Sequence, residues 1–482
     1  MPAVTGEQSR GRPTLGLWDA VSIIVGIVIG AGIYETAPLI FASVSSPAMA
    51  LSVWLMGGVL SLVGAACYAE LASTYPRSGG DYVYLTRAFG QLTGFLFGWA
   101  QLSIVLTGSI GMMAYVFADY AVALGEGQPG SAVVWAAAAV IVLTALHIAS
   151  VSVGSHLQNV LTGAKVLGVS AVVLAGAWLA FTRVGSSAVP AAAGAAREGS
   201  FGLAMILVLY TFGGWNDAAF VAAEVRDRKR NLPRALLLGT LAVTIIYLLM
   251  NAAFLAALGF EGAQRSRAIA RDVFTAVAGN WGGAAISILV MVSALGAASA
   301  LIFTGARVHA ALGSDYTLLS RLAVWHARFR SPAAALLAQG AVALVLIALV
   351  GTGWGRAAID NLALKLGLSQ VAWSGHGGFD TLLSCSAPVF WSFFLLTGLA
   401  LLRLRRLDPE LERPFRVPLY PLTPLVFCAT CAYMLYSSIQ YAGALALIGV
   451  APLLIGLPIY FASKRRLALD NSESPLLVSG TK

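Results

Sequence analysis

Long runs of apolar residues dominate the chain and are separated by short polar segments. A helix needs roughly 20 mainly apolar residues to cross the hydrocarbon core of a bilayer. Twelve stretches meet this requirement: 15–41, 47–73, 92–120, 131–149, 157–181, 201–225, 233–258, 282–308, 332–352, 383–402, 419–440 and 443–462. They are rich in Ala and Leu and much longer than the ~10-residue alternating strands of a membrane barrel. The pattern predicts an all-α integral membrane protein with about twelve transmembrane helices.

Composition supports the same class. Hydrophobic residues make up 59% of the 482 residues, and charged residues only 11%. A soluble domain carries about a quarter charged residues, so this chain has too little polar surface to coat a globule. Lipid must therefore be a large part of its solvent.

The basic residues predict the orientation of the spans. If the N-terminus is cytoplasmic, most of the 30 Lys and Arg residues lie on the cytoplasmic side, as positively charged inner loops require. The densest inner clusters are Arg226, Arg228, Lys229, Arg230 and Arg234, then Arg403, Arg405, Arg406, Arg413 and Arg416. Twelve spans then place both termini in the cytoplasm of a multi-pass protein of the plasma membrane. The net charge of +9 is dispersed among loops, which gives no ground for nucleic-acid binding.

Neither a metal centre nor an enzyme is indicated. The five histidines make no metal-ligand spacing such as HExxH, and no GxSxG or Walker-type loop stands out. Cys428 and Cys431 form a CxxC without a second ligand pair, so the four cysteines are expected to pack in the protein interior. A channel would need a pore-lining repeat or a charged ring, and neither is seen. We therefore expect no cofactor, no metal and no catalytic residues.

Glycine motifs fall at the centres of the first and sixth spans. Gly30, Ala31 and Gly32 interrupt the first span, and Gly213 and Gly214 interrupt the sixth. Each glycine costs about 1 kcal/mol relative to alanine inside a helix and permits backbone angles closed to other residues. Taken singly, either motif is consistent with close helix packing through small residues.

Taken together, the two breaks favour a transporter. Spans 1–5 and 6–10 then form two five-helix halves that must be inverted relative to one another, because five is odd. The predicted organisation is a tail at 1–14, a first repeat at 15–183, an inverted second repeat at 184–402, two additional helices at 403–462 and a tail at 463–482. Unwound turns at mid-membrane must line a cavity. The amino ends of half-helices attract a carboxylate, and free carbonyls accept hydrogen bonds from an ammonium group. A site with both kinds of group therefore suits a zwitterion.

At this point the sequence resembles amino acid permeases of the amino acid–polyamine–organocation superfamily, closest to the L-type branch. The resemblance rests on GAGIYE in the first span, YPRSGGDYVYLTRAFG after the second, FGGWN with NLPRA downstream, and PELERPFRVP after the tenth. It implies a LeuT-type fold, alternating access and amino acid transport. An amino acid sensor built on a carrier fold is a weaker alternative.

The resemblance also implies site residues. The substrate carboxylate would meet backbone amides of Gly30, Ala31 and Gly32, and the ammonium would meet carbonyls near Val28. Tyr210 stands where the family places an aromatic gate, although ordinary packing is an alternative for it. The full set of expected substrate-binding residues is Val28, Ile29, Gly30, Ala31, Gly32, Tyr210, Thr211, Phe212, Gly213 and Asn216.

Lys165 is a charge within the fifth span. It lies about 12 Å from the cytoplasmic start at ~1.5 Å per residue, and a lysine at mid-helix costs roughly 2.5–3.5 kcal/mol on insertion. The family places a lysine here in members that do not use sodium, so Lys165 is expected to bridge the broken first span to the eighth span near Ser299. A lysine that snorkels to the cytoplasm is the alternative.

Two acids complicate the substrate assignment. Glu35 follows the first break and departs from the neutral residue expected in L-type relatives, and Asp217 follows Asn216. They are candidates for a proton or cation site, although Glu35 could equally pair with a structural arginine or be solvated. Neutral L-amino acids are the expected substrate, with cationic amino acids or polyamines as the alternative. Exchange and proton-linked uptake both remain open.

Two loops carry further expectations. Animal L-type carriers bind a glycoprotein through a cysteine between the third and fourth spans, and GEGQPGS has none, so no disulfide-linked heavy chain is expected. After the eighth span, apolar residues at helical spacing predict an interfacial helix; they are Leu318, Leu319, Leu322 and Trp325. Segment 353–384 is predicted to be an outer insertion, with a loop that covers the outer mouth as the alternative.

Overall fold

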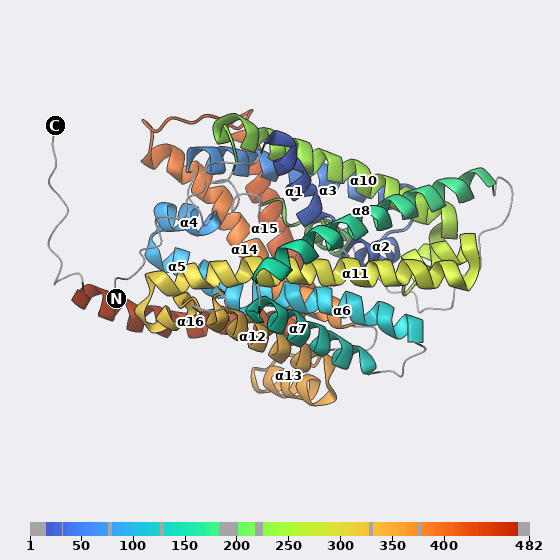
Figure 1. Ribbon diagram of the computed structural model, residues 1–482. Coiled ribbons are helices and arrows are strands. Elements are labelled where there is room, and N and C mark those ends of the chain that lie inside the picture. The colour runs from blue at the N-terminus through green and yellow to red at the C-terminus, as the bar shows by residue number, and fades with distance from the viewer. Residues whose placement is uncertain are drawn as a thin grey trace. The chain divides into compact units, whose positions relative to one another are not determined.

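Helices make up nearly all of the regular structure in the part of the chain that the computed structural model describes (Figure 1). The described residues are 16–30, 32–75, 80–125, 130–149, 151–182, 201–216, 225–326, 331–371, 373 and 377–470. The helices of the first half are α1 (Leu17–Val28), α2 (Gly32–Ala42), α3 (Pro47–Thr74), α4 (Asp81–Phe89), α5 (Gln91–Ala100), the π-helical η1 (Gln101–Val105), α6 (Leu106–Gly125), α7 (Ser131–Ala149) and α8 (Val151–Thr182). Those of the second half are α9 (Phe201–Thr211), α10 (Arg228–Arg265), α11 (Ile269–Asp315), the 3-10 helix η4 (Thr317–Ala323), α12 (Ala333–Gly351), α13 (Gly353–Lys365), α14 (Gly378–Leu407), α15 (Leu422–Ala442), η5 (Gly443–Leu445) and α16 (Ala446–Asp470).

The helix lengths confirm a multi-pass membrane protein. Within the described ranges, nine helical stretches are long and apolar enough to cross a bilayer. One of them, Leu422–Ser463, runs through α15, η5 and α16 and holds the last two predicted spans. Two shorter apolar helices at Leu17–Gly26 and Phe201–Thr211 belong to the first and sixth spans. The twelve predicted spans are thus accounted for, and the first and sixth are the interrupted ones.

Three details differ from the sequence-based expectation. Segment 353–384 contains a helix, α13, whose amino end is capped by the Thr352 hydroxyl accepting from Gly355 N at 3.0 Å. The interfacial segment after α11 is a short 3-10 helix, with Leu318 and Trp325 exposed as amphipathicity predicts. The predicted tail at 463–482 begins inside α16, which continues to Asp470.

Contacts divide the chain into two units, each built from three segments. The first unit comprises 1–88, 169–279 and 394–434, and the second comprises 89–168, 280–393 and 435–482. Each unit therefore takes helices from both predicted repeats. Four helices contribute to both units, namely α8, α11, α14 and α15, and the last residue of α4 belongs to the second unit.

In the first unit, small residues let α3, α9 and α10 approach closely. A Cβ added to Gly57 of α3 would lie 2.1 Å from Val208 of α9, and one on Gly58 would lie 2.3 Å from Thr244 of α10. Since neither neighbour leaves room for even a methyl group, these glycines set the distance at which the helices pack.

In the second unit, α12 and α14 pack closely on Tyr115 of α6. A Cβ added to Gly351, the last residue of α12, would lie 2.1 Å from the Tyr115 hydroxyl. One added to Gly378, the first residue of α14, would lie 2.3 Å from the ring. The same hydroxyl donates to the Ile347 carbonyl of α12 at 3.1 Å. Tyr115 is therefore enclosed where three helices meet.

Candidate functional site

The first span is interrupted at the predicted glycines. α1 ends at Val28, and Ile29 leaves the helix with φ −71° and ψ 90° after its N–H donates to Val25 O at 2.8 Å. α2 begins at Gly32, two residues past Gly30; Ala31 lies outside the described residues. The last carbonyls of α1 and the first amides of α2 consequently have no helical partner across the break.

The sixth span is interrupted after Thr211. Phe212 N donates to Val208 O at 3.0 Å, and Gly213 N donates to Tyr210 O at 2.8 Å, which closes the last turn of α9. Gly214 follows with φ +106°, a conformation that glycine adopts without steric cost. The Asn216 side chain contacts the break itself, since its Oδ1 accepts from Gly214 N at 3.3 Å. Asp217 lies outside the described residues.

Two contacts join the breaks to each other. The Thr36 and Thr211 hydroxyls form a buried hydrogen bond of 2.9 Å between α2 and the end of α9. The Tyr247 hydroxyl of α10 lies 2.8 Å from Val28 O and 3.1 Å from Thr211 O, the last carbonyls of α1 and α9. A single tyrosine hydroxyl therefore lies within hydrogen-bonding distance of the ends of both half-helices.

Aromatic side chains enclose this tyrosine. The ring of Tyr247 lies 5.4 Å from that of Trp54 and 5.1 Å from that of Phe212, both in edge-on arrangements. Phe212 is fully buried, so its side chain belongs to this packing, whereas Tyr210 is half-buried. The expected ammonium acceptor Val28 O thus already accepts one hydrogen bond, which leaves one of its two lone pairs.

Only backbone atoms lie close to the side-chain position of Gly30. A Cβ built on Gly30 would meet only Gly32 N and Val28 O, both at 3.9 Å, which is ordinary contact distance. No described side chain lies within 4 Å of this position, and in this sense the turn is open. A backbone amide and a backbone carbonyl on either side of one position suit a ligand that carries a carboxylate and an ammonium.

Lys165 and Ser299 lie in the second unit. Lys165 of α8 is only 3% exposed, and Ser299 of α11 is 1% exposed. The Ser299 hydroxyl lies 2.9 Å from Nε2 of His147, at the end of α7. His147 was not among the predicted site residues, since one histidine near the end of an apolar span carries no recognisable motif. The bridge from Lys165 to the first span stays a prediction.

Glu35 lies in the first turn of α2 and is half-buried. The positive end of a helix dipole stabilises a carboxylate in the first turn. This local effect accounts for an acid at this position whether or not it binds a proton or a cation.

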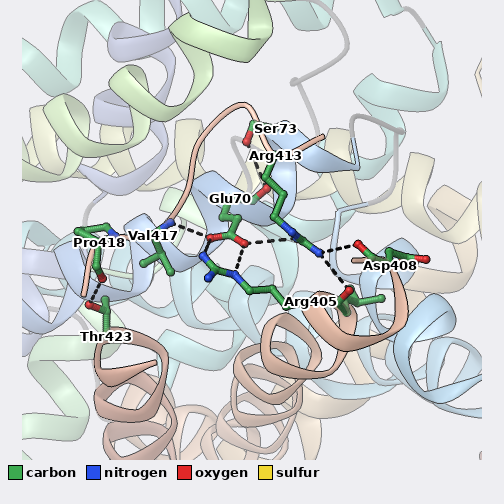
Figure 2. A network of polar contacts seen from close by, with 9 residues as sticks. Glu70, Ser73, Arg405, Asp408, Arg413, Val417, Pro418 and Thr423 are labelled. Atoms are coloured by element: carbon green, nitrogen blue, oxygen red, sulfur yellow. Dashed lines mark hydrogen bonds and ion pairs between the residues drawn. The ribbon is translucent and has the colours of Figure 1, made fainter. Parts of the chain in front are cut away.

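A second polar cluster lies where α3 and α14 end and was missed in the sequence (Figure 2). The Glu70 side chain is 0% exposed. Its Oε1 accepts from Arg405 Nε at 2.7 Å and Arg413 Nη1 at 3.3 Å, and its Oε2 accepts from Arg405 Nη2 at 2.5 Å and Val417 N at 2.7 Å. Both arginines and Val417 lie within or beside the PELERPFRVP motif, which therefore folds around one buried carboxylate.

Two further carboxylates anchor the same region. Asp408 accepts from Arg87 at 2.6 and 2.7 Å and from the Tyr75 hydroxyl at 2.7 Å, and the Arg87 guanidinium lowers the pKa of Asp408 to about 2. Asp81 is buried and its Oδ1 accepts from Tyr68 at 2.5 Å and Thr397 at 2.8 Å. Burial raises the pKa of Asp81 to about 6 in spite of these donors.

The described ranges contain no group of three or more His, Cys, Asp or Glu side chains that could hold a metal ion. All four cysteines are free and buried.

Comparison with known proteins indicates the family to which the sequence is similar. A family model described as amino acid permease matches residues 15–462. The chain is 30% identical to the human (Homo sapiens) b(0,+)-type amino acid transporter 1, over 84% of this chain and 78% of that protein. It is 30% identical to the human Asc-type amino acid transporter 1, over 94% and 83%. It is 28% identical to the serine/threonine exchanger SteT of Bacillus subtilis (strain 168), over 96% and 99%.

Proposed function

The chain belongs to the amino acid permease family of membrane transporters, and we propose that it exchanges neutral L-amino acids across the plasma membrane by alternating access without sodium. The observation that carries this proposal is the joined pair of helix breaks. Tyr247 and the Thr36–Thr211 hydrogen bond hold the ends of α1, α2 and α9 together beside the open turn at Gly30. A free amino acid presents the carboxylate and ammonium that these backbone ends can bind.

Support for a neutral substrate and for exchange comes from a relative. SteT, whose length this chain matches almost completely, is named a serine/threonine exchanger. The backbone groups at Gly30, Gly32 and Val28 recognise only the two charged ends of a substrate. The side-chain preference must come from other residues.

Support for sodium independence comes from Lys165. A buried ammonium in a membrane span must face a polar interior or a counter-charge. We place it as the substitute for a bound sodium ion, with Ser299 as the nearby group on α11.

The deciding experiment is counterflow in proteoliposomes. Vesicles loaded with unlabelled serine are expected to accumulate labelled serine equally in sodium and in choline buffer. Strict sodium dependence would contradict the role of Lys165, and binding without flux would favour a sensor. An imposed pH gradient that drives net uptake from empty vesicles would favour proton-linked uptake over exchange.

Cationic amino acids are the second candidate substrate. The half-buried Glu35 in the first turn of α2 is the observation that favours them. Lysine or arginine in excess should then compete with labelled serine. Competition that disappears in Glu35→Gln would support this candidate, whereas the absence of any competition excludes it.

Topology and assembly complete the proposal. We place both termini in the cytoplasm and expect activity without a disulfide-linked heavy chain. Labelling of single cysteines added to each terminus of the intact protein in cells tests the first point. Transport by the purified chain alone tests the second.

A further inference from the structure

The segment between α14 and α15, residues 408–421, is held in a defined conformation. Val417 N is bound to Glu70 Oε2 (Figure 2). The Arg405 guanidinium, which binds the same carboxylate, lies 3.7 Å from the centre of the Tyr420 ring. Arg413 Nη2 also donates to Leu404 O at 3.0 Å and Asp408 O at 3.3 Å, which ties the segment to the end of α14. Side chains displayed by this segment are therefore presented on a fixed backbone.

Two arginines of this region are exposed and take no part in that network. Arg406 and Arg416 form no ion pair with any other described residue, and each is the sequence neighbour of a residue bound to Glu70. The nearby carboxylates are largely committed, because Asp408 pairs with Arg87 and Glu412 pairs with Lys229 at 2.8 Å.

Glu410 is the remaining acid of the segment, and it is exposed. One carboxylate thus stands against two guanidinium groups, which leaves an excess of positive charge at the membrane surface.

Exposed apolar side chains follow Arg416 closely in the sequence. Leu419 is 75% exposed and adopts φ +52°, a left-handed conformation that is strained for leucine. Leu422, in the first turn of α15, is 58% exposed, and exposed residues continue along the membrane span at helical spacing; they are Leu425, Tyr436 and Ile439. Leu419 and Leu422 therefore extend the lipid-facing stripe of α15 to the end that carries the arginines.

We propose that Arg406, Arg416, Leu419 and Leu422 form a binding surface for an anionic phospholipid, hereafter the loop surface. The headgroup phosphate lies against the two guanidinium groups, which present forked donors that match phosphate oxygens. An acyl chain follows Leu419 and Leu422 onto α15. A lipid fits better than a soluble protein because the apolar part of the surface continues within the membrane span.

Lipid retention by the purified full-length protein tests this. Native mass spectrometry is run with phosphatidylglycerol and with phosphatidylcholine of the same chain length. The double variant Arg406→Gln/Arg416→Gln is expected to bind phosphatidylglycerol about 30-fold more weakly, because each arginine near a membrane surface contributes about fivefold. Its binding of phosphatidylcholine should stay unchanged.

A charge-matched control separates the site from a general effect of net charge. Arg267→Gln/Arg321→Gln removes two exposed arginines elsewhere and should retain phosphatidylglycerol as the wild type does. Asparagine tolerates positive φ, so Leu419→Asn preserves the backbone conformation but removes the apolar side chain. This variant should therefore weaken the binding of both lipids.

Equal loss in both double variants, or no loss in Arg406→Gln/Arg416→Gln, overturns the proposal. So does release of the bound lipid by excess inorganic phosphate alone, which would indicate a phosphate site without a lipid surface. Co-purification of a soluble protein that occupies the loop surface in place of lipid would also overturn it. Because the readout is lipid binding, its failure leaves the proposed transport activity untouched.

Discussion

Replacing Tyr247 by phenylalanine removes one oxygen atom from the contact that joins the two helix breaks. The hydroxyl has a single proton and two carbonyl neighbours, Val28 O at 2.8 Å and Thr211 O at 3.1 Å. The ring keeps its packing against Trp54 and Phe212, so the change is confined to hydrogen bonding. The expected result is a looser connection between α1 and α9, with both helices still formed.

The size of the effect follows from the number of bonds lost. A buried hydrogen bond contributes about 1 kcal/mol net, and a buried acceptor left without a donor costs about 1–3 kcal/mol. Both carbonyls end half-helices that border the open turn, so part of this energy should appear in substrate binding. A loss of about 1.4 kcal/mol there corresponds to a tenfold weaker apparent affinity.

The assay is serine exchange in proteoliposomes over a range of external serine concentrations, alongside thermal unfolding of the purified protein. Tyr115→Phe is the matched control, since its buried hydroxyl donates to a single helical carbonyl, Ile347 O, at 3.1 Å. Both variants should unfold at lower temperature than the wild type. Only Tyr247→Phe should raise the KM for serine.

Wild-type KM in Tyr247→Phe would refute the reasoning, and so would an equal rise of KM in Tyr115→Phe. The first result would mean that the hydroxyl stabilises the fold without positioning the breaks. The second would mean that any loss of a buried tyrosine hydroxyl disturbs transport.

Four further substitutions test other parts of the structure. Gly30→Ala should leave thermal unfolding unchanged, because its methyl group would meet only Gly32 N and Val28 O at 3.9 Å. It should abolish exchange, because the methyl group would occupy the position proposed for the substrate. Gly57→Ala should instead destabilise the protein by about 1–3 kcal/mol, since its Cβ would lie 2.1 Å from Val208. Glu70→Gln should destabilise by about 3–5 kcal/mol in thermal or denaturant unfolding, because it leaves two largely buried guanidinium groups without their anion. Burial raises the pKa of Asp81 to about 6, so the folded protein favours the protonated carboxyl group. The resulting stabilisation is complete below the pKa of this group in the unfolded chain, near 4, and is lost as the pH rises through 6. The free energy of unfolding of the wild-type protein should therefore fall by about 1–2 kcal/mol between pH 5 and 7.5. Asp81→Asn should abolish this fall, and an unchanged pH dependence in this variant would contradict the assignment.

Much of the fold was predictable because lipid imposes a strict rule on sequence. A membrane span needs a long apolar run, so the twelve spans could be read from hydropathy. The breaks were predictable only from the pairing of two glycine motifs at corresponding places in the first and sixth spans. Glycines near the centre of a span are not sufficient, because Gly57 and Gly58 stay within the helix α3 and serve close packing. The interruption between Val28 and Gly32 and the end of α9 at Thr211 confirm both.

Contacts between distant side chains could not be predicted in the same way. Tyr247 is separated from Val28 by 219 residues, and a tyrosine in an apolar span is indistinguishable from ordinary packing. The partner of Ser299 is His147, 152 residues away, and depends on how α7 and α11 are rotated about their axes. Hydropathy reports how long a span is but carries little information about its rotation, so hydrogen bonds between spans become visible only in three dimensions.

The burial of Glu70 has a consequence for biosynthesis. Its partners Arg405 and Val417 follow it by 335 and 347 residues, so they leave the ribosome long after α3 has entered the membrane. During that interval the nascent chain holds a carboxylate that the finished protein encloses completely. A chain that stops short of residue 405 therefore lacks the groups that neutralise Glu70, so this cluster can form only after most of the spans have been synthesised.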